Sequence, residues 1–245
     1  MPYKELRAEH IIGTAETLRN RVGERFPGRG ISGLSSELVS VTEELSERAD
    51  RMGRPFYLLR LTSLAVTTTG LVGLGVVIWQ NLRHFQLRTE DLSHFEGLEA
   101  VLNMMILIAA GIWFFLNLEA RIKRGRILDD LHVLRSLAHV IDMHQLTKDP
   151  SGIVNSAPKT RSSPVRDMQP YELLRYLDYL SEMLSLIGKV AALYLERVND
   201  SEVNRSVNEI EDLTSNLSRK IWQKIGVIEA SEIAADPTPL SAVNS

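Results

Sequence analysis

The residues most able to do chemistry gather in one short segment near the middle of this 245-residue chain. The segment holds three of the six histidines and three aspartates: His132, His139, His144, Asp129, Asp130 and Asp142. Imidazole and carboxylate groups are standard ligands for zinc, iron or manganese, so the segment is a candidate metal site. His139 and Asp142 are three residues apart and share a helix face. His144 lies about 140° around the helix from His139, so one straight helix cannot chelate an ion with both histidines.

Two structural interpretations of the same segment are also open. In the simpler one, the segment is a helix with a solvated polar stripe made of His132, Arg135, Ser136, His139 and Asp142. His144 then lies in the last turn, where a histidine is favourable to the helix dipole. In the other, a polar network between helices fixes their register, and its members are Arg135, His139 and Asp142. We favour these interpretations over a metal or catalytic site, and we expect no cofactor.

Other catalytic chemistry has little support in the sequence. The chain has no cysteine, which excludes disulfides, thiol catalysis and Cys-ligated metal centres. No nucleophile–base arrangement, glycine-rich phosphate loop or HExxH spacing is present. The net charge of -3 gives no footprint for nucleic-acid binding. We therefore predict a non-enzymatic protein, and a metal-dependent membrane enzyme that uses the His139/Asp142 region is the last alternative.

Two apolar segments determine the predicted fold class. They run from Leu61 to Gln80 and from Ala100 to Leu118, and neither contains Asp, Glu, Lys or Arg. Each has about the 20 residues that a helix needs to cross the hydrocarbon layer. The sequence thus predicts an all-α integral membrane protein with two transmembrane helices, at 57–80 and 99–118, joined by an extracytoplasmic loop at 81–98.

Basic residues near these segments predict the orientation. Four arginines precede the first segment, and four basic residues follow the second: Arg121, Lys123, Arg124 and Arg126. The positive-inside rule then places both termini in the cytoplasm. The second cluster is either a topology signal alone or also a site for anionic lipid headgroups. The first 56 residues are polar and charged, so no cleavable signal peptide is expected.

Small residues in the first apolar segment indicate close helix packing. Ala65, Thr69 and Gly73 form a small-xxx-small series, which favours a contact with the second span or with another copy of the chain. A sharper alternative is a small oligomeric ion channel, whose pore would be lined by threonines of the same segment: Thr62, Thr67, Thr68 and Thr69.

The polar parts of the chain predict a cytosolic helical assembly. Residues 1–56 read as a helical hairpin, 119–148 as an extension of the second span, 149–169 as a flexible linker and 231–245 as a disordered tail. Residues 170–230 read as a second hairpin, because a coiled-coil-like seam loses its register near Asn199. That seam comprises Leu173, Leu177, Leu180, Leu184, Ile187 and Ala191. We expect the cytosolic helices to form a homo-oligomer.

One string of residues also resembles a segment of known proteins. The sequence LRSLAHVIDMHQLTKDP, Leu134 to Pro150, is similar to a segment of bacterial two-span membrane proteins with no established activity. The resemblance extends to the FPGRG turn after Arg25 and to SRKIWQKI at Ser218 to Ile225. It implies a bacterial inner-membrane setting and no mechanism. We thus expect an oligomeric, membrane-anchored scaffold or signal-transducing module, with the ion channel second and the metal enzyme third.

Overall fold

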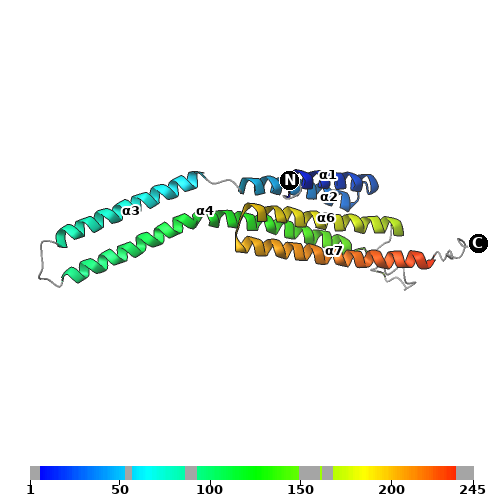
Figure 1. Ribbon diagram of the computed structural model, residues 1–245. Helices are drawn as coiled ribbons and strands as arrows, with labels where there is room; N and C mark the ends of the chain where they lie inside the picture. The colour runs from blue at the N-terminus through cyan, green and yellow to red at the C-terminus, as the bar shows by residue number, and fades with distance from the viewer. Residues whose placement is uncertain (1–5, 53–56, 86–92, 149–160, 162–167, 236–245) are drawn as a thin grey trace, which may run out of the picture. The chain divides into compact units, whose positions relative to one another are not determined.

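The computed structural model describes residues 6–52, 57–85, 93–148, 161 and 168–235 (Figure 1). The described residues form helices and no strands, which confirms the all-α prediction. The helices are α1 (Ala8–Arg25), α2 (Gly30–Met52), α3 (Tyr57–Phe85), α4 (Ser93–Leu146), α6 (Pro170–Arg197) and α7 (Ser201–Ala235). The chain divides into unit 1, Met1–Gly53 with Ile127–Ser245, and unit 2, Arg54–Arg126, and α4 contributes to both.

Unit 1 is a bundle in which α1, α2, α6, α7 and the last part of α4 pack alongside one another (Figure 1). Each helix buries apolar residues at spacings of three and four. On α1 these are Ile11, Ala15, Leu18 and Val22, and on α4 they include Ile127, Leu131, Leu134, Ala138 and Ile141. This spacing returns to the same face of a helix about every two turns, so the apolar faces meet in one core.

Hydrogen bonds between residues distant in the sequence fix the directions of the helices in unit 1. Leu6 contacts Glu196 and Arg21 contacts Glu182, so α1 and α6 are antiparallel. On α4, the residue Asp130 lies at one end of the bundle and His144 at the other, and we call these the Asp130 end and the His144 end. Arg48, which donates a hydrogen bond to Asp130, lies in the last part of α2. α2 therefore ends, at Met52, on the Asp130 end of the bundle.

The turn between α1 and α2 explains the FPGRG sequence. Phe26 is buried, and its carbonyl accepts hydrogen bonds from the backbone amide of Arg29 and the hydroxyl of Ser32. Gly28 has φ of 70°, which a residue with a side chain rarely adopts. Phe26 also contacts the rings of Tyr176 and Tyr179 edge-on. The turn therefore reverses the chain and docks it onto α6.

The coiled-coil-like seam is buried inside the bundle of one chain. Its six residues, Leu173, Leu177, Leu180, Leu184, Ile187 and Ala191, are between 0 and 6% exposed. The register break falls between helices, since α6 ends at Arg197 and the Asp200 side chain accepts hydrogen bonds from the first amides of α7. The homo-oligomer thus stays a prediction, and this seam no longer motivates it, because its residues already have partners within the chain.

Unit 2 is a pair of antiparallel helices, α3 and the first part of α4. The Ser63 hydroxyl donates to the carbonyl of Phe115, and a Cβ on Gly70 would lie 3.7 Å from the Ile108 side chain. Two helices of the described chain are long and apolar enough to cross a membrane, with candidate spans at Leu61–Gln80 and within Leu102–Leu146. None of the apolar window in either helix is buried.

Helix ends in the structure differ from the expected boundaries. We expected a loop at 81–98, but α3 runs to Phe85 and α4 begins at Ser93. The sequence after Gly75 contains no glycine or proline until Gly97, so nothing breaks α3 where its apolar segment ends. Likewise α7 runs to Ala235. Most of the expected linker at 149–169 and the tail from 236 lie outside the described residues.

Candidate functional site

The three residues of the predicted polar network lie on α4 but do not contact one another. Arg135 forms an ion pair with Glu209 of α7 at 2.6 Å. Asp142 accepts a hydrogen bond from the Gln145 side chain at 2.7 Å. His139 is exposed, and no hydrogen bond in the described part of the chain joins it to either residue. The contact between helices that we expected is made by Arg135 alone.

The metal hypothesis finds no geometric support in the described residues. No group of three histidine, aspartate or glutamate side chains lies close enough together there to hold an ion. His139 is exposed, whereas His144 is half-buried at the His144 end. The two histidines therefore face different surroundings, as their angular separation on the helix requires.

His144 packs into the junction of three helices. Its Nδ1 lies 3.1 Å from the hydroxyl of Tyr176 on α6, and its Cε1 would lie 3.1 Å from a Cβ on Gly30 of α2. Burial lowers the pKa of His144 below its ordinary value, and the charge of Lys148 lowers it further. His144 lies in the last turn of α4, as expected, and its lowered pKa reduces the fraction of the ring that is charged and can interact with the helix dipole. A side chain at position 30 would therefore require the His144 ring to shift by a few tenths of an ångström.

The end of α4 is held by a lysine that sequence reasoning missed. The ammonium group of Lys224, on α7, donates to the carbonyl of Gln145 at 2.8 Å and to that of Lys148 at 3.4 Å. The last carbonyls of a helix have no partner within the helix and carry partial negative charge. The Gln145 carbonyl also accepts the backbone amide of Lys148 at 3.1 Å, so the ammonium group adds a second donor and a positive charge at the C-terminal end of α4. No pattern in the sequence of α4 could indicate it, because the lysine is distant in the sequence.

The most buried ionisable cluster of unit 1 lies at the Asp130 end and was also missed. Asp130 is 3% exposed and accepts hydrogen bonds from Arg48 at 2.7 Å and from the hydroxyl of Tyr194 at 2.9 Å. Tyr194 is fully buried, and its oxygen also lies 3.2 Å from the carbonyl of Leu45. Burial and the neighbouring Asp130 carboxylate raise the pKa of Tyr194, which stays protonated. The cluster joins α2, α4 and α6.

A sequence signal for this cluster does exist. Asp130 lies between Ile127, Leu131 and Leu134, within the apolar arc that the periodicity of α4 defines. A carboxylate in an apolar arc requires hydrogen-bond donors, because an unpaired buried charge is very costly. The sequence could therefore have identified Asp130 as paired, although its partners on two other helices could not be named.

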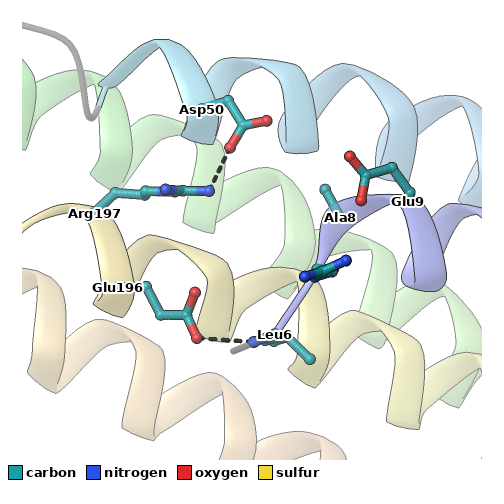
Figure 2. Close-up of a pocket in the computed structure, with 7 residues that line it drawn as sticks. Leu6, Ala8, Glu9, Asp50, Glu196 and Arg197 are labelled. Atoms are coloured by element: carbon teal, nitrogen blue, oxygen red, sulfur yellow. Dashed lines mark hydrogen bonds and ion pairs between the residues drawn. The ribbon is translucent and has the colours of Figure 1, made fainter. Parts of the chain in front are cut away.

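A polar pocket of about 560 Å³ lies near the same end, between α1, α2 and α6. Figure 2 shows the ion pair of Arg197 with Asp50, at 2.8 Å, and the hydrogen bond from the Leu6 amide to Glu196, at 3.0 Å. The pocket is also lined by Arg7, Ala8 and Glu9. The charged groups of this pocket therefore connect the start of α1 to the ends of α2 and α6.

The small-residue series of α3 does not face α4. Ala65, Thr69 and Gly73 are exposed, and a Cβ on Gly73 would contact nothing within 4 Å. The half-buried residues of α3 are instead Ser63, Thr67, Gly70, Leu74 and Val77, which alternate by four and three. Within one chain, α3 therefore packs through a different face, and a contact of the series with another copy of the chain stays a prediction.

The threonines proposed for a pore point in different directions. Thr67 lies on the face toward α4, Thr69 is exposed, and Thr68 donates back to the carbonyls of Leu64 and Ala65. A hydroxyl that is bonded to its own helix is a common arrangement in apolar surroundings. No single face of α3 collects the four threonines, so the arrangement in one chain does not favour the channel.

The basic cluster after the second apolar segment is already engaged within the chain. Lys123 forms an ion pair with Glu119 at 2.9 Å, and the Arg121 guanidinium lies 6.0 Å from the centre of the Phe114 ring. Arg124 and Arg126 also interact with other groups. Headgroup binding would therefore use cations that have partners, and it stays a prediction.

The polar clusters of the described residues serve to hold helices together. The contacts of Asp130, His144, Lys224 and Arg135 each link two or three helices. The feature that sets unit 2 apart is the apolar surface of α3 and α4, and the feature that sets unit 1 apart is the buried Asp130 cluster. Comparisons of the chain with models of protein families, with curated proteins and with solved structures find no match.

Proposed function

We propose that this protein is a two-span membrane protein whose helical bundle works as a membrane-anchored scaffold or signal-transducing module. The observation that carries the proposal is the surface of unit 2. Large apolar side chains are exposed all along α3, among them Leu61 (65%), Val72 (67%) and Trp79 (60%), and α4 exposes Ile106 and Leu107 in the same way. Each contributes about 1.5–3 kcal/mol when it leaves water completely. A lipid bilayer satisfies this surface without a further protein.

The basic residues that flank the spans support an orientation with both termini in the cytoplasm. Arg60 precedes the first span, and Arg121 and Lys123 follow the second. Both parts of the bundle then lie on one side, as folding into a single unit requires. Together with the resemblance at Leu134 to Pro150, this favours the bacterial inner membrane. Anionic lipids are the partners that the basic cluster would attract.

The continuity of α4 supports a role in transmission. The helix contains both the second candidate span and, at Asp130, a residue of the bundle's buried polar cluster. A shift or rotation of the span would therefore act on the contacts of Asp130 with Arg48 and Tyr194. A buried charge cluster tolerates few arrangements, because each lost partner costs free energy, so it is suited to a switch between discrete states.

Membrane extraction tests the proposal. Wild-type protein should stay in the membrane pellet at alkaline pH and be released only by detergent. Val72→Arg places a charge at the outward face of α3, at an apparent insertion cost of about 2.5–3.5 kcal/mol near the span centre, and should reduce the inserted fraction. Val227→Arg, on the 44%-exposed Val227 of α7, is the matched control and should not. Release of the wild type without detergent would contradict the proposal.

A further inference from the structure

The part of α4 that belongs to unit 2 packs through a seam with heptad spacing. Its half-buried residues include a series that alternates by three and four: Met105, Ile108, Ile112, Phe115, Glu119 and Ile122. Gly111, Leu118, Lys123 and Arg124 are also half-buried. Ile108 lies beside Gly70 of α3, and the carbonyl of Phe115 accepts the Ser63 hydrogen bond, so this seam faces α3. Spacing of this kind is the signature of helices that pair along a continuous stripe.

The same spacing continues in the part of α4 that belongs to unit 1, where its residues are exposed. Beyond Ile122 the spacing passes through the exposed Arg126 and reaches an outward stripe, which we define as Asp129, Val133, Ser136, Val140 and Met143, followed by Thr147. The bundle buries a neighbouring face of the helix, which includes Ile127, Leu134 and Ile141. α4 therefore carries one seam that is packed in unit 2 and, at the same spacing in unit 1, an outward stripe of exposed residues.

Three of the seven exposed large apolar side chains among the described residues of unit 1 belong to the outward stripe, and a fourth, Leu146, is adjacent to it; the other three are Tyr171, Trp222 and Val227. Val133 is 42% exposed, Val140 46%, Met143 64% and the adjacent Leu146 58%. By contrast, the described residues of α1 and α2 include no exposed large apolar side chain, although both helices lie on the surface of the same bundle. Single exposed apolar residues need no explanation, but a stripe of them at heptad spacing indicates an interaction surface.

We propose that the outward stripe pairs with the same stripe of a second copy of this chain, as a short parallel two-stranded coiled coil. If Met105 is assigned to heptad position a, then Val133, Val140 and Thr147 of the outward stripe also occupy a positions. All three are β-branched. β-branched residues at a favour two parallel strands. A parallel arrangement is also the one that two copies with the same membrane topology can form.

The membrane determines how strong this contact has to be. Asp129 and Ser136, at d positions, make the stripe a weak coiled coil by itself. Two chains held in one membrane meet at a high effective concentration, which compensates for a weak contact. In this respect the inference rests on the two-span placement proposed above.

Single cysteines test the pairing directly, because the chain has none of its own. We would place one cysteine at Val133, Ser136, Val140 or Met143 of the full chain in native membranes, with Asn20 on the exposed face of α1 as the control. A disulfide needs Cα atoms within about 7 Å, so parallel pairing predicts same-residue cross-links at all four positions and none at Asn20. Cross-links at one position only would indicate an antiparallel crossing and overturn the proposal. Equal cross-linking of Asn20, no cross-links, or a product with the mass of another protein would also overturn it.

Charged variants separate loss of pairing from loss of folding. In the Ser136→Cys background, Val140→Glu with Met143→Glu should reduce cross-linked dimer about tenfold or more, because like charges then face each other. Val227→Glu, at a similarly exposed valine of α7, should reduce it little. Circular dichroism of all variants should be unchanged; an unchanged dimer yield in the double variant would contradict the proposal.

Membrane extraction of the same samples distinguishes failure of this inference from failure of the proposed function. Protein that is retained in the membrane but does not cross-link refutes the pairing and leaves the two-span placement standing. Protein that is released without detergent refutes the two-span placement. Cross-linking of this released protein at the same four cysteine positions then tests, in solution, whether the outward stripe pairs.

Discussion

Removing the charge of Arg48 should destabilise the bundle far more than removing that of a neighbouring arginine. Arg48→Met leaves the Asp130 carboxylate, which is 3% exposed, with the Tyr194 hydroxyl as its one remaining partner among those described above. Breaking a buried pair by removing one partner costs about 3–5 kcal/mol. Because the Arg48 side chain is itself 42% exposed, water can reach part of the site, and we expect about 2–3 kcal/mol.

The matched control is Arg51→Met on the same helix. Arg51 pairs with Glu47 at 3.9 Å, and their side chains are 64% and 76% exposed. Exposed pairs of this kind contribute about 0–1 kcal/mol. For a domain of this size, the expected difference lowers the Tm of Arg48→Met by about 4–12 °C relative to the wild type and leaves Arg51→Met near it.

The assay needs to report the bundle and not the spans. A single cysteine at Ser181, a buried position on α6, is close to the serine in size and reacts with a thiol reagent only when the bundle opens. Labelling during a thermal ramp then gives the midpoint for unit 1. Adding Asp130→Asn to Arg48→Met removes the uncompensated charge and should restore most of the loss. The reasoning is refuted if the two arginine variants behave alike, or if the double variant is no more stable than Arg48→Met.

Three further predictions concern α4 and α6. The lowered pKa of His144 means that the unfolded chain binds a proton more readily than the folded one, so the stability due to neutral His144 is present above pH 6.5 and is lost as pH falls below it. His144→Gln should remove this part of the pH dependence, and equal slopes below pH 6.5 in denaturant titrations would contradict it. Leu180→Asp buries a charge at a site with 0% exposure and should unfold the bundle, whether or not the protein is oligomeric. Unfolding would be measured as faster labelling of the Ser181→Cys thiol by the thiol reagent. His139→Asn should change the bundle's free energy of unfolding by no more than about 0.5 kcal/mol, as at other exposed positions. Elemental analysis should give the same metal content for both proteins, and a transition metal lost with the histidine would contradict this.

Periodicity in the sequence was sufficient to locate the helices. The apolar residues of α1, such as Leu18, and those of α6, such as Leu180, recur at helical spacing and are buried where that spacing places them. This succeeds because a helix can bury a stripe only if the stripe lies on one face. The two candidate spans are found for a similar reason, since length and lack of charge are properties of the segment alone.

Which face of a helix meets which partner was not predictable in the same way. On α3, the series with Gly73 and the face with Gly70 both contain small residues, and only the position of α4 selects the latter. On α4, the polar stripe expected around His139 also contains Val140 and Met143, because two neighbouring faces carry apolar residues at the same spacing. The partners of Asp130 and His144 come from helices distant in the sequence, so their contacts depend on the packing of the whole bundle.

Reporter fusions after Gln86 and after Pro150 test the central claim, that this is a two-span protein with its bundle on one side of the membrane. One fusion joins the reporter between the two apolar segments, and the other joins it after α4. We expect the Gln86 fusion to report the outside and the Pro150 fusion to report the cytoplasm. If both fusions report the same side, the chain does not cross the membrane as proposed and the account is contradicted.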